Sequence, residues 1–494
     1  MNKEIIIIGS GIAGIACALR LSELGFKVKV FEKNNRPGGK ISDKSARDYR
    51  FDTGPSLLTM PELINELIMF SYPKTEHLIN FKQLEIICKY FYRDGTIINS
   101  FRNTKDFASE IENKTGEKKE NVLNFLQRSK YMYDLTKELF IFSPFRTFEN
   151  IFSTPSLNIA CKFRHLDSFK TMYERNRLWF TNKKIVQLFN RYATYNGSNP
   201  YKAPATLNII AHLEHNTGAF LPEKGMYNLV DVLYKLARDK GVEFLLSSKV
   251  DKIITNGSNV KGVEVKGKNY SSNIVISDVD IFSLYYQLLP GKKIPGYLLK
   301  QELSSSAVIF FWGIKNEYPN LEIHNILFSE CYKTEFEHIF TKKMIYNDPT
   351  VYIYISSKYI PADAPKGCEN WFVMINAPNN SGQDWDKLVN EARKHIILKI
   401  NKILNTNIES YIEYEDYADP RTIENNTASY KGAIYGNSSN SKLAAFLRHK
   451  NFINRFKGLY FVGGSVHPGG GIPLCLASAK IVTEKITKSY SLNK

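Results

Sequence analysis

Three glycines near the amino end stand at a spacing that suits the binding of a phosphate-containing ligand. Gly9, Gly11 and Gly14 follow the apolar run 5–8 in the pattern Gly-x-Gly-x-x-Gly. In this pattern the first glycine allows a tight turn, the second lets a pyrophosphate approach the backbone, and the third lets a helix pack against a strand. The amides and dipole of the helix amino end favour an anion. The predicted chemistry is therefore the binding of a dinucleotide through its diphosphate.

The elements that position these glycines form one strand–helix–strand unit. Four consecutive isoleucines at 5–8 are typical of a parallel strand covered by helices on both faces. A helix is expected over residues 12–24, ended by Gly25, and a second strand over 27–31. Glu32 follows where an acid would accept hydrogen bonds from an adenosine ribose. The whole series is a more specific signal than the glycines alone.

A second glycine turn follows directly, in residues 34–40, Asn-Asn-Arg-Pro-Gly-Gly-Lys. Its cations, Arg36 and Lys40, could face the diphosphate, although isolated loop charges are more often solvated. Simple nicotinamide enzymes usually continue into another strand–helix unit at this point, whereas large flavoproteins use such a turn to close over FAD. The turn therefore favours FAD over NAD. Residues 51–56, Phe-Asp-Thr-Gly-Pro-Ser, predict a further strand-to-turn transition with a polar apex.

Near the carboxyl end a short apolar strand, 460–462, runs into five glycines within nine residues and then into a helix rich in small residues. Such a turn presents backbone amides to a negative or polarised group, and the ring of a reduced flavin, negative near N1 and O2, is a good candidate. His467 lies within this turn, where a histidine before proline is more often structural than catalytic.

The middle of the chain is predicted from its apolar patterns. Residues 61–221 read as mostly helical and aromatic, which indicates either core or an apolar tunnel with a membrane-facing lid. An amphipathic helix is expected over 226–240, and a β meander over 242–277 with Asn256-Gly257 as its hairpin turn. Strands at 306–313, 350–356 and 371–377 predict a second, antiparallel sheet, followed by a helix over 384–405.

Charge and composition exclude several classes of protein. The chain has 494 residues, and 66 Lys and Arg against 49 Asp and Glu give a net charge of +17. The basic residues are scattered singly, which indicates a solvated surface, although anionic lipid or nucleic acid would also be attracted. No groove-reading motif is present, so we expect no nucleic-acid partner. Six widely spaced cysteines argue against a zinc site or a disulfide framework, and no apolar run is long enough to span a membrane or act as a signal peptide.

With these motifs the chain resembles the carotenoid (phytoene desaturase-like) desaturase family of FAD flavoproteins, within the amine-oxidase/GDI-type fold. The resemblance runs nearly end to end and rests on the first two glycine turns, on 51–55, on 199–206 leading into 220–222, and on 467–473. The last, His-Pro-Gly-Gly-Gly-Ile-Pro, is the most specific. Phytoene desaturases usually carry Gly-Ala-Gly-Thr before the His-Pro and Gly-Ala-Gly after it, whereas this chain is more similar to the hydroxycarotenoid 3,4-desaturase subgroup.

The resemblance implies an α/β fold: a Rossmann-like FAD-binding domain with an inserted α+β substrate domain that carries an antiparallel sheet and a helical lid. We expect the FAD-binding domain in residues 1–60, 222–285 and 456–494, and the substrate domain in 61–221 and 286–455. Val250 would meet the adenine through its backbone, and the last glycines would approach the ribityl chain and the isoalloxazine ring. The candidate cofactor-binding positions are Gly9, Gly11, Ile12, Ala13, Gly14, Glu32, Lys33, Arg36, Gly38, Gly39, Lys40, Gly54, Pro55, Ser56, Val250, Asp278, Gly463, Gly464, Gly470, Gly471 and Ile472.

The reaction so implied is desaturation of a carotenoid, in which FAD accepts a hydride while a proton leaves the neighbouring carbon. No strong base is required, and Glu214 and His467 are the candidate catalytic residues, with His215 a further polar group near the flavin. Phytoene desaturation, polyene saturation or isomerisation, and a non-enzymatic prenyl-lipid escort are alternatives. We expect no metal, a cytoplasmic location with peripheral attachment to the membrane surface, and oxygen or a quinone as the electron acceptor.

Overall fold

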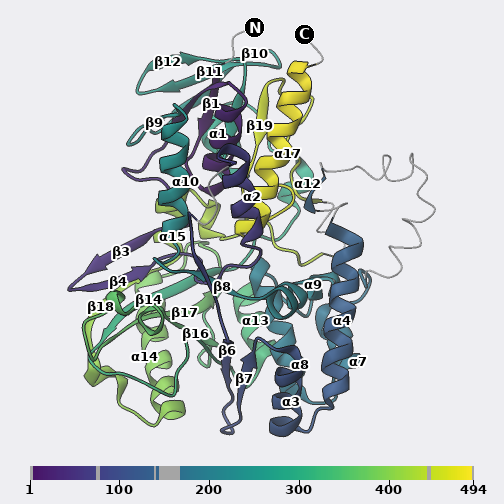
Figure 1. Cartoon of the computed structure of the whole chain (residues 1–494), viewed down its shortest axis with the longest axis vertical. Helices are drawn as coiled ribbons and strands as arrows, with labels where there is room; N and C mark the ends of the chain where they lie inside the picture. Colours follow the sequence, from purple (N-terminus) through teal and green to yellow (C-terminus); the bar gives the residue numbers. More distant parts are fainter. Residues whose placement is uncertain (1–3, 74–77, 138–140, 144–166, 442–446, 492–494) are drawn as a thin grey trace.

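Two sheets of different type organise the computed structural model, which describes residues 4–73, 78–137, 141–143, 167–441 and 447–491. Figure 1 shows a parallel sheet with its helices in the upper half of the molecule and a largely antiparallel sheet in the lower half. The chain passes between the halves several times, so each half combines segments that are distant in sequence.

The upper sheet has five parallel strands in the order β19-β13-β1-β2-β9. Helices α1, α10 and α17 pack together on one face, where Ile5 and Ile7 are buried. The other face, with Ile6 and Ile8, packs against the small sheet β10-β11-β12. The expectation of helices on both faces of β1 is therefore only partly correct, because the second face packs on this small sheet together with the short helical segments that contain Phe282 and Tyr285. The elements are β1 (Glu4–Ile8), α1 (Ile12–Glu23), β2 (Lys27–Phe31), α10 (Asn228–Asp239), β9 (Glu243–Leu245), β10 (Lys252–Asn256), β11 (Asn259–Val265), β12 (Lys268–Ser271), β13 (Val275–Ser277), β19 (Leu459–Phe461) and α17 (Ile472–Ser491).

The predicted β meander is only partly correct. The hairpin at Asn256-Gly257 joins β10 to β11 as expected, and β12 adds a third antiparallel strand. The flanking strands do not belong to it, because β9 pairs parallel with β2 and β13 pairs parallel with β1 and β19. Their partners lie far away in sequence, and a local alternation pattern carries no information on such pairing.

The lower sheet has seven strands in the order β18-β14-β17-β16-β15-β6-β7, antiparallel except for the pair β15 and β6. Alternate residues face opposite sides. One side, with Trp312, Val351 and Val373, packs on α14, while the side with Phe311, Tyr354 and Phe372 belongs to the main core. The elements are β6 (Ile86–Phe91), β7 (Ile97–Phe101), β14 (Ser306–Ile314), β15 (His324–Leu327), β16 (Val351–Ile355), β17 (Glu369–Ala377), α14 (Trp385–Leu404) and β18 (Ile412–Ala418).

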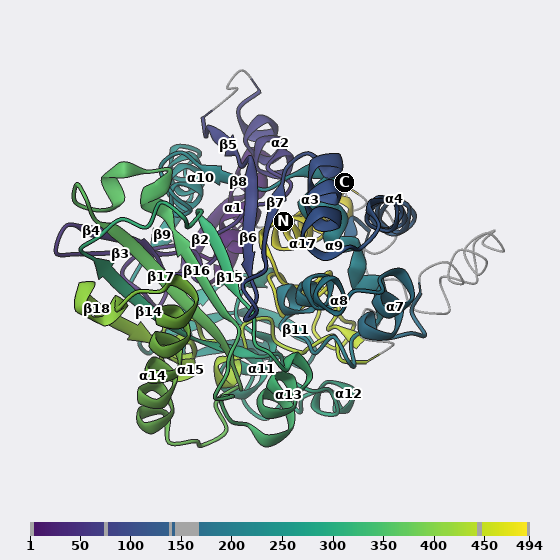
Figure 2. The same ribbon diagram turned by 90° about the horizontal axis from the view of Figure 1, so that it is seen from below.

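Residues 61–221 are less helical than expected, because β6 and β7 extend the lower sheet and β5 pairs with β8. Figure 2 shows the helices of this segment gathered on the side of the molecule away from α14 and β18. The remaining elements are α2 (Glu62–Ser71), β5 (Phe81–Gln83), α3 (Thr104–Thr115), α4 (Lys119–Thr136), α7 (Met172–Trp179), α8 (Lys183–Asn190), α9 (Ile209–His212), β8 (Phe220–Pro222), α11 (Ile281–Ser283), α12 (Gly296–Leu299), α13 (Tyr332–Glu337) and α15 (Pro420–Thr427).

The hairpin of β3 (Asp43–Ala46) and β4 (Tyr49–Asp52) joins the two halves. The ring of Phe51 lies 5.7 Å from that of Phe311 on the lower sheet, and Arg50 donates to Asp363 at 2.9 Å. All strands of the upper sheet come from the segments assigned to FAD binding, and all strands of the lower sheet come from the others. The domain boundaries themselves stay a prediction. Within the described ranges, no helix has the length and apolarity needed to cross a membrane.

Candidate active site

A cavity of about 710 Å³ extends from the carboxyl ends of the parallel strands to the lower sheet. Glu214 and His467, the two candidate catalytic residues, line it. So do most of the candidate cofactor positions, namely Gly9, Gly11, Ile12, Glu32, Lys33, Gly38, Gly39, Lys40, Gly54, Pro55, Ser56, Val250, Asp278, Gly464, Gly470, Gly471 and Ile472. Four candidates, Ala13, Gly14, Arg36 and Gly463, do not line it.

The first glycine turn closes around a half-buried carboxylate. The amide of Gly14 donates to Oδ2 of Asp278 at 3.0 Å, and a Cβ on Gly11 would lie 2.5 Å from the same oxygen. A Cβ on Gly14 would overlap the carbonyl of Gly9, so this glycine serves the close packing of α1 on the turn. Burial raises the pKa of Asp278 to about 7, with the nearby Glu32 adding to the shift and the glycine amides and Lys40 opposing it.

Glu32 is held in place for a hydroxyl-bearing ligand. Its Oε2 accepts hydrogen bonds from the amide and the hydroxyl of Ser10, both at 2.8 Å, and its Oε1 accepts one from the amide of Asn34 at 2.9 Å. The side chain is only 5% exposed, yet it lines the cavity, so its carboxylate keeps acceptor capacity toward a ligand there. The position at the end of β2 is the one predicted for a ribose-binding acid.

The second glycine turn lies directly on the first. The amide of Gly38 donates to the carbonyl of Ser10 at 2.8 Å, and a Cβ on Gly39 would lie 3.3 Å from Cα of Gly11. Gly54 approaches from the β4 side, where a Cβ would overlap the carbonyl of Lys40. The three turns thus form one surface made mainly of backbone, in which added side chains have no room.

Of the two cations in the second turn, only Lys40 lines the cavity. The guanidinium of Arg36 donates to Asp43 at 2.6 Å and stacks on the ring of Tyr227, with 4.0 Å between the guanidinium carbon and the ring centroid. These two partners hold Arg36 on the β3 hairpin, outside the cavity lining, and its contact with the diphosphate stays a prediction. Lys40 donates to the carbonyl of Ile434, and burial lowers its pKa although Asp280 and Asp278 oppose that shift.

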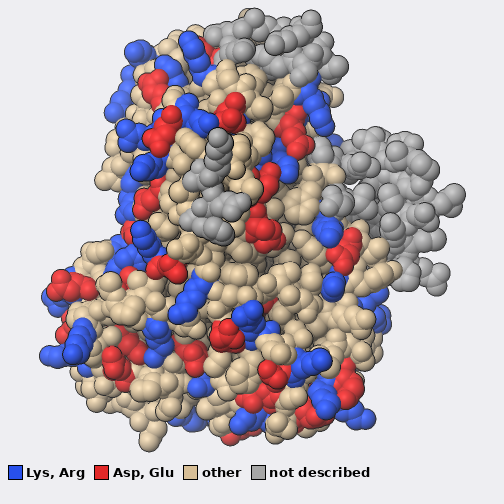
Figure 3. All heavy atoms as spheres, in the orientation of Figure 1, with Lys and Arg blue, Asp and Glu red and all other residues tan. Residues whose placement is uncertain are grey.

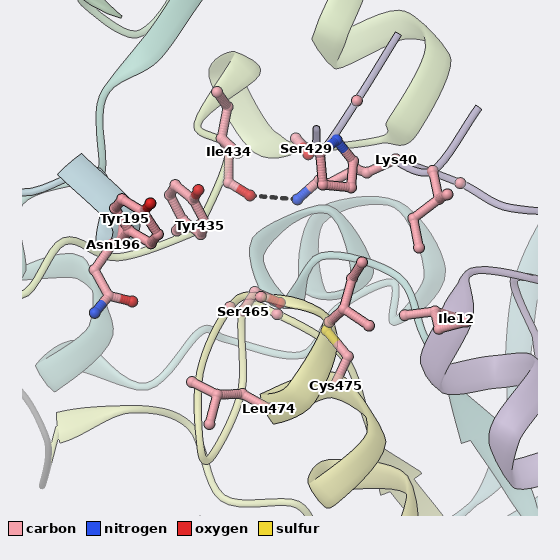
Figure 4. A pocket seen from close by; sticks show the side chains of 18 of the residues that line it. Ile12, Lys40, Tyr195, Asn196, Ser429, Ile434, Tyr435, Ser465, Leu474 and Cys475 are labelled. Carbon is pink, nitrogen blue, oxygen red and sulfur yellow. Dashed lines mark hydrogen bonds between the residues drawn. The ribbon is translucent and has the colours of Figure 1, made fainter. Parts of the chain in front are cut away.

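The closing turn supplies the opposite wall of this part of the cavity. Figure 4 shows Ile12 and Lys40 on one side of the space and Ser465, Leu474 and Cys475 on another. Behind the turn, Arg448 donates to the carbonyls of Gly464 and Tyr435, both at 3.3 Å. A Cβ on Gly470 would overlap the ring of Tyr435, so this glycine lets the aromatic ring lie against the turn.

Beyond these turns, mainly apolar side chains of the lower sheet line the cavity, and a polar cluster follows them. The inner face of the lower sheet contributes strand residues from β6, β14, β15, β16 and β17. Alternation along β14, β15, β16 and β17 brings their residues to the same face, whereas β6 contributes two consecutive residues next to an irregularity in its pairing with β7. These residues are Ile87, Cys88, Ile309, His324, Ile326, Tyr352, Phe372, Met374 and Asn376.

A buried ion pair borders this wall. Arg191 donates to Oε1 of Glu214 at 2.8 Å, and Tyr192 donates to the same oxygen at 2.7 Å, while Tyr195 donates to Oε2. Burial alone would raise the pKa of Glu214, but the guanidinium and these hydrogen bonds outweigh it and hold the pKa below its ordinary value. Glu214 is thus an ionised, fully engaged carboxylate, which does not suit the role of a free general base.

The two candidate histidines have structural partners. Nε2 of His467 is 3.0 Å from the carbonyl of Ser143, and burial lowers the pKa of this histidine to about 4. His215 does not line the cavity; its ring stacks on Phe107 and its Nε2 lies 2.8 Å from the hydroxyl of Tyr192. Both imidazoles are neutral near pH 7.

The cofactor end fits a dinucleotide that carries a flavin. Glu32 suits the adenosine ribose, the turn at Gly11 suits the diphosphate, and Val250 lines the same cavity, while its contact with the adenine stays a prediction. Asp280 lines the same region, and its buried Oδ2 has no hydrogen-bond partner within the described part of the chain, which leaves an acceptor for a ligand hydroxyl. The fold and this site define a flavin-dependent oxidoreductase.

The chain matches the model of the flavin containing amine oxidoreductase family over residues 12–280, and it belongs to that family. It is 48% identical to a 1-hydroxycarotenoid 3,4-desaturase of Flavobacterium sp. (strain P99-3), with 98% of this chain and 99% of that protein covered. It is 30% identical to a 4,4'-diaponeurosporene oxygenase of Staphylococcus aureus (strain MRSA252), with both chains covered in full. Among solved structures, cyclohexylamine oxidase from Brevibacterium oxydans IH-35A shares the fold at a TM-score of 0.61 and 15% identity, covering 99% of each chain. The protein is an FAD-dependent oxidoreductase.

The sequence motifs do not include several residues of the site. Tyr435 and Arg448 lie outside the named helices and strands and belong to no sequence motif. Tyr352 and His324 lie on strands of the lower sheet, and alternation within the predicted strand 350–356 would have placed Tyr352 and Tyr354 on one face. No local signal indicates which of the two faces forms the cavity wall.

Proposed function

We propose that the protein is a carotenoid desaturase of carotenoid biosynthesis that introduces the 3,4 double bond of a hydroxylated carotenoid. The observation that carries the proposal is the 48% identity, over nearly the whole of both chains, to a relative named for that reaction. FAD, when bound, supplies the hydride acceptor. A cavity that leads from the cofactor turns along the inner face of the lower sheet supports the proposal, because a polyene needs a long apolar wall.

The residues of the protein act mainly by aligning the substrate and by shielding it from water. Ile87, Ile326 and Phe372 exclude water along the substrate, which keeps the reacting carbons dry and aligned. Arg191 and Glu214 neutralise each other, so they place no net charge beside a polyene whose electrons are displaced during the reaction. Among the described side chains at the cavity, neither Glu214 nor His467 is an unengaged base, which agrees with a reaction that needs none.

The test is to load the purified protein with FAD and offer it a hydroxylated carotenoid and phytoene in parallel, each in liposomes. We expect the hydroxylated substrate alone to lose two hydrogens by mass and its polyene absorbance to shift to the red. Conversion of phytoene alone would contradict the proposed substrate, and a gain of hydrogen would indicate a saturase. A product heavier by oxygen would place the protein with the relatives named oxygenases. Membership of an oxidoreductase family argues against the alternative that the protein is a non-enzymatic escort of prenyl lipids.

We also propose that the protein attaches to the surface of an anionic membrane, from which it takes its substrate. Large apolar side chains are exposed on α4, on the segment before α7, and on α7: Tyr131 at 45%, Phe169 at 76% and Leu178 at 63%. Asp167 holds the three parts together, since Arg128 of α4 and Arg175 of α7 lie 3.6 and 3.1 Å from it. The basic residues exposed on the same parts are Lys119, Lys130, Lys170 and Arg177.

The cavity supports this location. Thr136 and Ile141 line it, and so does Ser168, which is next to Phe169. Figures 1 and 2 show α4 and α7 adjacent, on the side of the molecule away from α14 and β18. On the face seen in Figure 3, positive and negative side chains are intermixed, which gives that face no broad basic patch for a nucleic acid. The predicted membrane-facing stretch 125–180 also includes residues outside the described ranges.

Vesicle flotation tests the attachment. Replacing Phe169 and Leu178 with serine should reduce binding to vesicles rich in phosphatidylglycerol, whereas Leu398→Ser, at 65% exposure on α14, should not. Each Lys or Arg near the surface contributes about 1 kcal/mol, so Lys170→Glu with Arg177→Glu should weaken binding and reduce its dependence on salt. Equal loss in the Leu398 control would contradict the assignment of this face.

A further inference from the structure

Three polar side chains connect the cofactor end of the cavity to the lower sheet. Oγ of Ser56 lies 2.6 Å from the hydroxyl of Tyr352, which lies 2.8 Å from Nδ1 of His324. Ser56 follows the close-packed turn at Gly54, while Tyr352 and His324 stand on the neighbouring strands β16 and β15. All three residues line the cavity, so the series runs from the cofactor turns into the substrate region.

The series ends at an atom without a partner. His324 is 2% exposed, and its Nε2 has no hydrogen-bond partner anywhere in the described structure. The ring is held between two others, since it stacks on Tyr352 and Tyr354 with interplanar angles of 17° and 16°. A buried ring nitrogen is normally hydrogen-bonded. A ring nitrogen that is fixed on a cavity wall and has no such partner marks a position where a ligand atom supplies the missing hydrogen bond.

The positions of the protons on Ser56, Tyr352 and His324 decide whether the ligand atom donates or accepts a hydrogen bond. The single hydroxyl proton of Tyr352 is donated either to Ser56 or to Nδ1 of His324. In the first case Nδ1 carries the imidazole proton and Nε2 is an acceptor; in the second Nε2 carries the proton and donates. A hydroxyl group can donate or accept, so it satisfies both states. A hydrocarbon satisfies neither.

The charge around His324 favours a neutral partner. Burial lowers the pKa of His324 to about 3, with Glu214 opposing the shift and Arg191 adding to it. Glu214 and Arg191 are themselves a pair, so the region carries no net charge. A neutral imidazole in a neutral setting suits an alcohol better than a carboxylate or an ammonium group.

We propose that His324 binds the hydroxyl group of a hydroxylated carotenoid and thereby sets the preference of the enzyme for that substrate. The inference rests on the proposed function and names the residue that would enforce it. In a 1-hydroxy substrate, carbon 2 alone separates the hydroxyl-bearing carbon from carbon 3 of the bond to be desaturated. The group that holds the hydroxyl must therefore lie close to the cofactor, and the hydrogen bonds through Tyr352 to Ser56 provide that proximity.

The test compares a hydroxylated carotenoid with the same polyene lacking the hydroxyl. The variants are His324→Leu, which removes both nitrogens, and His324→Gln, which keeps a donor and an acceptor. Tyr352→Phe removes the hydroxyl that orients the ring, and Tyr354→Phe is its matched control, because the Tyr354 hydroxyl donates to Asp52 and does not line the cavity. Flavin absorbance and thermal unfolding verify that each variant is folded and loaded with FAD.

The measured quantity is the ratio of kcat/KM for the hydroxylated over the non-hydroxylated substrate. We expect His324→Leu to lower this ratio about tenfold or more, through the loss of kcat/KM on the hydroxylated substrate. Tyr352→Phe should lower it less, His324→Gln should retain part of it, and Tyr354→Phe should leave it unchanged. The ratio of the wild type should be constant from pH 6 to 8, because His324 stays neutral over that range.

A binding measurement separates this inference from the proposed function. The hydroxylated product and its analogue without the hydroxyl need no turnover, and their dissociation constants follow from the shift in polyene absorbance. A binding preference that His324→Leu abolishes supports the inference even if the wild type desaturates neither substrate. An unchanged preference in His324→Leu, or an equal loss for both ligands, overturns it.

Discussion

The two ends of the cavity are built in different ways. The cofactor end consists mainly of backbone from three short turns, in which Gly11, Gly38 and Gly54 lie so close to neighbouring groups that a side chain would collide. The substrate end consists of side chains from strands and helices that are distant in sequence, with the pair of Arg191 and Glu214 buried among tyrosines. A backbone surface is sensitive to added volume, whereas a buried charge pair is sensitive to the loss of either partner.

Removing one charge at the substrate end should have the largest effect. Arg191→Met leaves the buried Glu214 carboxylate without its cation, which should reduce the free energy of unfolding by about 3–5 kcal/mol. Chemical denaturation of the FAD-loaded protein measures this. The control is Lys29→Met, whose exposed partner Glu243 lies 3.2 Å away, and its effect should stay below about 1 kcal/mol. Similar losses in the two variants would contradict the difference drawn between a buried and an exposed pair.

Added volume at the cofactor end should remove the cofactor instead. Gly11 has backbone angles of −67° and 174°, which valine also adopts, so Gly11→Val tests space alone. The new side chain would meet Asp278 and fill the approach to the diphosphate, and we expect FAD affinity to fall about a hundredfold or more. Flavin absorbance after desalting and a titration with FAD measure this. Gly296→Ala, with no atom within 4 Å of the added Cβ, should keep its flavin.

Gly470 lies where the two ends meet, and its replacement should have an intermediate effect. Gly470→Val would push the ring of Tyr435 out of place, so we expect FAD to be retained and turnover to fall about tenfold. The added mutation Tyr435→Ala relieves the collision and should restore part of the activity. If the double variant were no better than Gly470→Val, the valine would be acting on the substrate or the cofactor directly and not through Tyr435.

The same contrast explains what the sequence could reveal. The first strand–helix–strand unit, Glu32, and the hairpin at Asn256-Gly257 depend on neighbouring residues, and all were predicted within a residue or two. The position of Arg36 outside the cavity lining could not be predicted, because its partner Asp43 belongs to a hairpin whose fold back onto the turn has no motif. His324 faces Tyr352 only because β15 pairs with β16, and Arg191 meets Glu214 through the packing of irregular helices. Long-range pairing of this kind leaves no pattern in a short window.

The smallest predicted effect concerns pH and again belongs to the cofactor end. Asp278 lies half-buried beside Gly11 and Gly14, and desolvation raises its pKa to about 7, with Glu32 and Lys40 as its charged neighbours. Below its ordinary pKa the neutral carboxyl favours the folded state fully, and this contribution is lost as pH rises through about 7. Ionisation also adds a negative charge next to the diphosphate, so FAD affinity should fall, by less than about tenfold in all, as the pH rises from 7 to 8.5. Titrations with FAD between pH 6 and 8.5 should show this decline in the wild type and a flat profile in Asp278→Asn, which keeps an acceptor for the Gly14 amide. The same decline in Asp278→Asn would assign the titration to another group.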